Sequence, residues 1–182
     1  MSAGGSRVPN AVRSREYRPS ARFFRLEHLR QLRGSEQVAA VCYRIRKSGI
    51  EFLLVQTRHR RWTFPKGSAE PGLTHAQAAA LEAFEEAGVH GRIEEMAFAR
   101  YVRRKRGSDP AIETAVNAHL CEVLWLDAPQ EAGRNPTWCS VEKAKRRLQE
   151  NRVEDFGSEL VGVVEQAVSR IQRLSRGAGP SG

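Results

Sequence analysis

Residues 65–89 read PKGSAEPGLTHAQAAALEAFEEAGV and carry the strongest structural signal in the chain. Within them, Thr74 and Gln77 fit the S/T-x-x-E/Q capping box, in which each side chain satisfies a backbone amide of the other residue. The run from 74 to 87 is rich in alanine, and Gly88 follows as a natural C-terminal stop. The sequence therefore predicts a helix of roughly three to four turns that starts at Thr74.

Three glutamates lie on one face of this predicted helix. At 100° per residue, Glu82, Glu85 and Glu86 fall within a sector of roughly 100°. Like charges at these spacings destabilise a helix by about 0.2–0.5 kcal/mol per pair, and residues 68–91 contain no Lys or Arg that could neutralise them. A hard cation such as Mg²⁺ takes carboxylate oxygens readily. We interpret the face as a metal site, and the alternative is an acidic face exposed to water.

The remaining faces of the helix predict its packing. Leu81 and Phe84 point away from the glutamates, so we expect this apolar side to pack on a sheet. Ala78 and Ala79 lie beside the glutamates, where their small size would let a ligand approach closely.

The spacing of this segment resembles the sequence box of the Nudix hydrolases. Gly67 is followed at the box intervals by Glu82, Glu85, Glu86, Gly88 and Val89, and Pro65-Lys66 before the glycine is a familiar start of the box. Leu73 and Leu81 depart from the box, which has Glu and Arg at these positions. Replacing both members of an ion pair by apolar groups can be neutral, whereas losing one member is costly. We interpret the two leucines as a compensated substitution, and the alternative is an inactive site.

The resemblance implies an α+β fold, an α/β/α sandwich with a mixed sheet between helices. It also implies that Glu82 and Glu86 bind Mg²⁺ or Mn²⁺, that Glu85 is the catalytic base or a further ligand, and that water attacks a phosphoanhydride bond. Glu113 on a later strand could add an outer carboxylate. Within the family, residues 37–170 are most similar to diphosphoinositol polyphosphate phosphohydrolases. Diphosphoinositol polyphosphates and dinucleoside polyphosphates are therefore the expected substrates.

A phosphorylated substrate requires cationic groups near the box. Arginine and lysine stay charged and offer several donors to each phosphate, although any one of them could equally belong to a solvated basic surface. The candidate substrate-binding residues are Arg58, Lys66, Gly67, Arg103, Lys105 and Arg134.

The rest of the chain predicts one domain over residues 35–175. Segments 37–45 and 50–57 read as a hairpin around the Lys47-Ser48-Gly49 turn. An extended piece at 62–64, strands at 93–103 and 111–126, and helices at about 141–149 and 158–174 are also expected. Residues 1–34 are predicted to be a largely disordered arm with a short helix at 21–33, and residues 176–182 a flexible tail.

Composition and charge restrict the classes of function. The chain has 182 residues, of which 40% are apolar and 28% charged, as in globular proteins, and no run approaches the roughly 18 apolar residues of a membrane span. The three cysteines lie far apart, which predicts reduced thiols and a cytoplasmic location. The arm also shares its basic, acid-poor composition with organelle transit peptides.

The basic charge predicts an anionic partner. Of the net charge of +9, eight arginines and two glutamates place +6 in residues 1–34. A phosphorylated small molecule is the leading expectation. Two other hypotheses remain: a pyrophosphohydrolase that acts on the 5′ end of RNA, and a catalytically weak module that binds phosphate or RNA, with nucleic acid contacting the arm. The sequence leaves the oligomeric state open.

Overall fold

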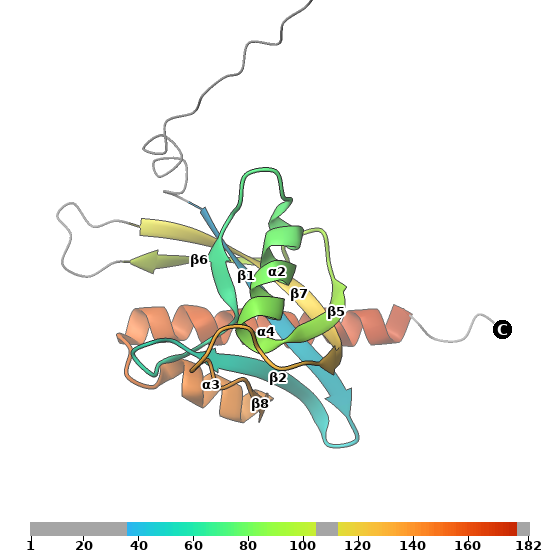
Figure 1. Ribbon diagram of the computed structural model, residues 1–182. Coiled ribbons are helices and arrows are strands. Elements are labelled where there is room, and N and C mark those ends of the chain that lie inside the picture. The colour runs from blue at the N-terminus through green and yellow to red at the C-terminus, as the bar shows by residue number, and fades with distance from the viewer. Residues whose placement is uncertain (1–35, 105–112, 178–182) are drawn as a thin grey trace, which may run out of the picture.

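The computed structural model describes residues 36–104 and 113–177 (Figure 1). The predicted arm, Lys105 and residues 178–182 lie outside this range, so the domain boundaries remain predictions. No helix among the described residues is long and apolar enough to cross a membrane.

The described residues form a mixed sheet of eight strands. At its centre, β1 (Glu36–Arg46) and β7 (Glu113–Leu126) run parallel, and all other pairs are antiparallel. The order is β3-β2-β1-β7-β5, with β4 also pairing with β1, β6 with β7, and β8 with β2. The remaining strands are β2 (Gly49–Gln56), β3 (Trp62–Thr63), β4 (Lys66–Ser68), β5 (Val89–Ile93), β6 (Ala99–Arg104) and β8 (Thr137–Ser140).

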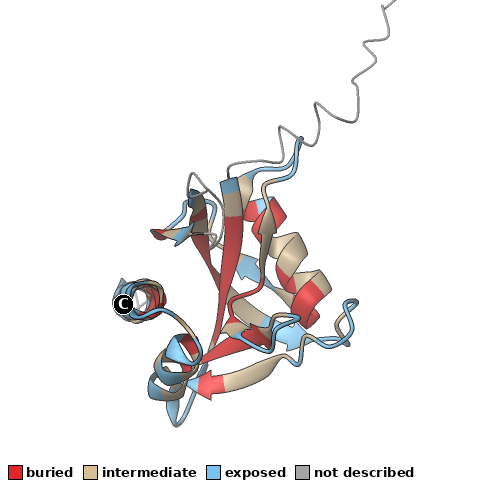
Figure 2. Cartoon of the chain, turned by 90° about the vertical axis from the view of Figure 1, so that its left-hand side faces the viewer, coloured by how far each residue is buried: buried red, intermediate tan, exposed pale blue. Residues whose placement is uncertain are grey.

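Helices cover both faces of the sheet, as Figure 2 shows. On one face lies α2 (His75–Ala87), and on the other lie α3 (Val141–Gln149) and α4 (Glu154–Gly177). Alternate residues of β1 point to opposite faces of the sheet. Val41 lies in the core beneath α3 and α4, and Cys42 lies in the core beneath α2. The predicted α+β sandwich is therefore confirmed.

The predicted hairpin, the strand at 111–126 and the helices at 74–87, 141–149 and 158–174 are present, but the prediction of one strand at 93–103 was wrong. In its place β5 ends at Ile93 and β6 starts at Ala99. The Glu94 and Phe98 amides still donate to the Leu120 and Ala118 carbonyls of β7, but the chain between them leaves the sheet. The sequence also gave no signal for β4 and β8, or for the start of β5 at Val89.

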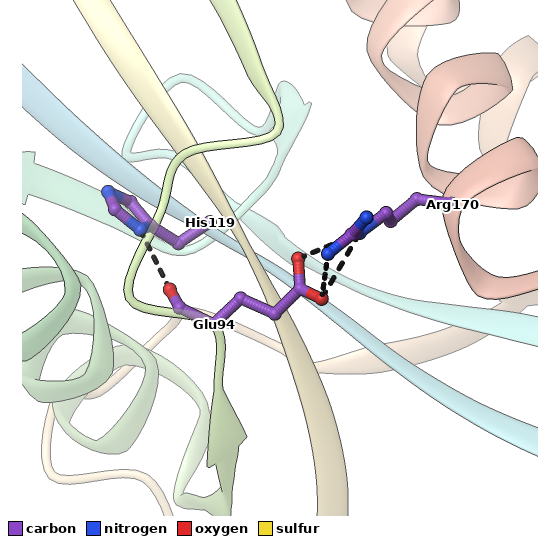
Figure 3. A network of polar contacts seen from close by, with 3 residues as sticks. All are labelled: Glu94, His119 and Arg170. Carbon is purple, nitrogen blue, oxygen red and sulfur yellow. Dashed lines mark hydrogen bonds and ion pairs between the residues drawn. The ribbon is translucent and has the colours of Figure 1, made fainter. Parts of the chain in front are cut away.

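Glu94 connects the segment between β5 and β6 both to the sheet and to helix α4 (Figure 3). Its carbonyl oxygen accepts a hydrogen bond from His119 Nδ1 on β7 at 3.0 Å. Its carboxylate accepts from Arg170 Nε and Nη2 on α4 at 3.2 and 3.1 Å. The connection between β5 and β6 is thus tied to the sheet and to the helix that packs on it.

Helix α2 begins and ends as predicted but packs through a different face. Thr74 and Gln77 form the capping box, and Gly88 ends the helix with a φ of 66°. Leu81 and Phe84, expected against the sheet, are only half-buried. The expectation for Ala78 and Ala79 was also wrong, because both belong to the core beneath α2. The small alanine side chains let the helix approach the sheet closely, which brings its glutamates near β4.

Candidate active site

Gly67 on β4 lies directly against the Glu82 side chain on α2. A Cβ atom placed on Gly67 would lie only 1.6 Å from Glu82 Oε1. Glu82 also borders a small cavity of about 240 Å³ lined by residues 68–71 of the loop. The absence of a side chain at Gly67 is therefore what lets this carboxylate lie against the β4 backbone.

Glu86 lies deeper than the other glutamates, with a side chain only 3% exposed. Its Oε2 accepts a hydrogen bond from the Lys66 amide at 3.3 Å, and its Oε1 lies 2.6 Å from Arg134 Nη2. Arg134 belongs to the loop between β7 and β8, and it also pairs with Glu131 at 2.7 Å. Glu86 thus joins the helix, β4 and this loop.

Glu85 is half-buried, and its backbone helps to fix the loop between β7 and β8, which carries Glu131 and Arg134. The Glu131 amide donates to the Glu85 carbonyl at 2.9 Å, and the Gln56 amide donates to the Arg134 carbonyl at 2.6 Å. Within the described residues, the Glu85 carboxylate forms no ion pair, so its oxygens remain available to a ligand or a water molecule.

Burial shifts the ionisation of the charged groups in this cluster. It raises the pKa of Glu86 from 4.5 to about 7, with Glu82 adding to the rise and Arg134 opposing it. Burial also raises the pKa of Glu82, helped by Glu85 and Glu131. The pKa of Lys66 is lowered by burial and by nearby Arg103 and Arg134. The two carboxylates are therefore costly to ionise without further positive charge beside them.

The donor atoms of the cluster suit a hard cation. Carboxylate oxygens are preferred ligands of Mg²⁺, which usually keeps several waters in its shell. In the part of the chain that the structure describes, no three His, Cys, Asp or Glu residues converge into a complete metal cage. Glu82 instead lies against Gly67, and Glu86 is paired with Arg134. The cluster therefore offers ligands from one helix face rather than an enclosed site.

The predicted basic residues divide into two groups. Lys66 and Arg134 lie at the glutamates, and Arg103 on β6 is exposed but near enough to Lys66 to lower its pKa. Arg58 lies on the loop between β2 and β3 and lines a cavity of about 690 Å³. Arg134 lines this cavity too and connects it to Glu86.

Three further residues complete the comparison with the sequence prediction. Glu113 is exposed at the start of β7, opposite Arg104 on β6. Leu73 is 39% exposed at the end of the loop between β4 and α2, and Leu81 is half-buried on α2. The interpretation of these two leucines as a compensated substitution stays a prediction.

Glu131, which was not predicted from the sequence, pairs with Arg134 and contributes to the raised pKa of Glu82. No motif marks this residue, because it reaches the site only through the packing of its loop on α2.

Comparison with known proteins identifies the family. The family model of the NUDIX domain matches residues 35–158. Diphosphoinositol polyphosphate phosphohydrolase 3-beta from Bos taurus is 31% identical over 119 residues, which span 63% of this chain and 69% of that protein.

Solved structures agree in fold. An Ap4A hydrolase from C. elegans, in a binary complex, has a TM-score of 0.61 at 24% identity, covering 76% of this chain and 98% of the hydrolase. The NUDIX domain of Shewanella oneidensis NrtR, complexed with ADP ribose, has a TM-score of 0.57 at 18% identity, covering 76% and 88%. From the family match, the related sequence and this shared fold, the chain belongs to the Nudix hydrolase family.

Proposed function

We propose that this protein is a metal-dependent hydrolase of phosphoanhydride bonds. The observation that carries the proposal is the pair of half-buried Glu82 and buried Glu86. Their carboxylates lie against the Gly67 backbone and the Lys66 amide, and both have raised pKa values. A divalent cation at this helix face would relieve the cost of ionising both groups. Nudix hydrolases generally use such ions, for example Mg²⁺.

The proposed roles follow from the position of each side chain. Glu82 and Glu86 would hold Mg²⁺ or Mn²⁺, which when bound neutralises phosphate charge and makes a coordinated water more acidic. Glu85 has no ion pair among the described residues and lies on the same helix, so it would accept the proton of the attacking water. The Gly67 backbone would contribute to binding beside Glu82.

The cationic residues would bind the phosphates that are not cleaved. Arg134 and Lys66 lie at the glutamates, and Arg58 and Arg103 extend the positive charge to either side. Several guanidinium groups around one anion give geometric selectivity as well as charge. Lys105 remains a candidate of the same kind, although it lies outside the described residues.

The proposed substrates are diphosphoinositol polyphosphates or dinucleoside polyphosphates. The similarity to a bovine diphosphoinositol polyphosphate phosphohydrolase supports the first class. The 690 Å³ cavity beside Arg134 has arginines in its wall, which suits either class of polyanion. A 5′-triphosphorylated RNA end contains the same kind of phosphoanhydride bond and belongs in the same assay.

The test is turnover of purified protein with Mg²⁺ or Mn²⁺ against both substrate classes and triphosphorylated RNA. We expect hydrolysis of at least one substrate, its loss with EDTA, and a loss of at least about 100-fold in Glu85→Gln. Glu95→Gln, on an exposed glutamate outside the cluster, is the matched control and should keep full activity. Binding of the polyanions without turnover would contradict the proposal and favour a module that only binds phosphate.

We also propose that nucleic acid contacts the basic arm of residues 1–34. The support is the net charge of +6 in this segment, which suits phosphate backbones. Deletion of the arm should weaken RNA binding and leave hydrolysis of small substrates unchanged. Equal RNA affinity with and without the arm would contradict this role.

A cytoplasmic location is proposed as well, because Cys42, Cys121 and Cys139 are buried free thiols, which suits a reducing compartment. Microscopy of the tagged full chain tests this, and signal confined to an organelle would contradict it.

A further inference from the structure

Arg134 is paired with the Glu86 carboxylate, which the proposed metal would also bind. Both oxygens of Glu86 are engaged, Oε2 by the Lys66 amide at 3.3 Å and Oε1 by Arg134 Nη2 at 2.6 Å. Mg²⁺ binds oxygens at about 2.0–2.1 Å and demands a nearly octahedral shell. A guanidinium on the same oxygen would obstruct that shell and repel the ion. A carboxylate oxygen has more than one acceptor site, so the hydrogen bond from the Lys66 amide, which is held in the pairing of β4 with β1, can stay. The positive charge of Arg134 beside Oε1 is the contact that opposes the ion.

Arg134 already has a second carboxylate to which it can transfer. Glu131 Oε2 lies 2.8 Å from Arg134 Nε and 2.7 Å from Nη2, so the guanidinium bridges Glu131 and Glu86. The Glu131 side chain is 45% exposed, whereas the Glu86 side chain is 3% exposed. Arg134 can therefore leave the buried partner and remain paired with the more exposed one.

The loop that carries Arg134 does not depend on the contact with Glu86. Its backbone is fixed by the Glu131 amide on the Glu85 carbonyl and by the Gln56 amide on the Arg134 carbonyl. Arg134 also lines the 690 Å³ cavity, which has room for a moved side chain. A side-chain movement alone can thus open Oε1 of Glu86.

We propose that Arg134 is the resident counter-ion of Glu86 in the metal-free protein, and that a divalent ion displaces its guanidinium onto Glu131 and into the cavity. The inference rests on the proposed function, because it takes a metal at Glu86 as given. Arg134 then changes role when the metal binds: it leaves an internal ion pair and becomes available to a substrate phosphate. Because coupling between two sites is reciprocal, a phosphate compound that holds Arg134 in the cavity would also tighten metal binding.

The test compares Mn²⁺ affinity, measured by electron paramagnetic resonance, in the full-length wild type, Arg134→Gln and Arg58→Gln. Titrations run under argon at about pH 8.5, so that Glu86 is ionised. We expect Arg134→Gln to bind Mn²⁺ about tenfold more tightly than the wild type, a typical size for coupling between two sites. Arg58 lines the same cavity but, in the part of the chain that the structure describes, forms no ion pair with Glu86. Arg58→Gln should therefore change the affinity by less than about twofold.

Each outcome of this comparison is decisive. Equal or weaker Mn²⁺ binding by Arg134→Gln would overturn the inference while leaving the metal site intact. An equal gain in Arg58→Gln would also overturn it, because general charge would then explain the effect. Absence of Mn²⁺ binding in all proteins would overturn the proposed function together with the inference. If Arg134→Gln fails to fold by circular dichroism, Arg134→Lys replaces it; it keeps the charge, loses the two-pronged contact and should bind Mn²⁺ several-fold more tightly.

Discussion

Replacing Glu86 by glutamine should make the metal-free protein more stable at alkaline pH. The pKa of Glu86 is raised from 4.5 to about 7, mainly by burial. Between these values the folded protein holds a proton that the unfolded chain has released, so stability falls as the pH rises through this window. The full difference corresponds to about 3 kcal/mol of unfolding free energy. Glutamine keeps the shape and one acceptor but is neutral at every pH.

Urea denaturation in the presence of EDTA measures this effect. At about pH 8.5, Glu86→Gln should exceed the wild type by about 2–3 kcal/mol, and the difference should vanish near pH 4, where the native carboxyl is also neutral. The control Glu95→Gln changes an exposed residue and should stay within about 0.5 kcal/mol at both pH values. A Glu86→Gln protein that is less stable at alkaline pH, or a difference that does not vary with pH, would refute the electrostatic reasoning.

Three further substitutions test other parts of the structure. Thr74→Ala removes the capping box of α2 and should lower the unfolding free energy by about 1 kcal/mol in urea; an unchanged curve would show that tertiary packing alone holds the helix start. Gly67→Ala should push the Glu82 carboxylate from its place and reduce kcat/KM by about 100-fold with an unchanged circular dichroism spectrum. Retained activity would mean that Glu82 need not lie against β4. Glu94→Gln weakens the pair with Arg170 and should cost about 0.5–1 kcal/mol, with a matching fall in melting temperature; no fall would show that the connection is held by its backbone alone.

Helix α2 could be predicted from sequence because its ends are set by local chemistry. The reciprocal bonds of Thr74 and Gln77 and the left-handed conformation of Gly88 depend only on near neighbours in the chain. Strands β4 and β8 have three and four residues, too few for a pattern of alternation, and exist because of the strands beside them. Their prediction would have required the register of β1 and β2.

The packing face of α2 could not be predicted from its large apolar residues, because Leu81 and Phe84 are only half-buried. The structure instead buries Ala78, Ala79 and Ala83, since a helix lying close to a sheet needs small side chains. The three glutamates could still be assigned to one site, because their spacing is independent of which other face packs. The position of Arg134 on Glu86 could not be predicted, because it depends on a loop that packs on the helix from a distant part of the sequence.

Phosphorus NMR of a diphosphoinositol polyphosphate or dinucleoside polyphosphate incubated with the protein tests the central claim most directly. With Mg²⁺, the wild type should convert the phosphoanhydride signal into product phosphate signals, and Glu86→Gln should leave the spectrum nearly unchanged over the same time. A signal that persists with the wild type under Mg²⁺ or Mn²⁺, or that decays equally fast with Glu86→Gln, would contradict hydrolysis by this glutamate cluster.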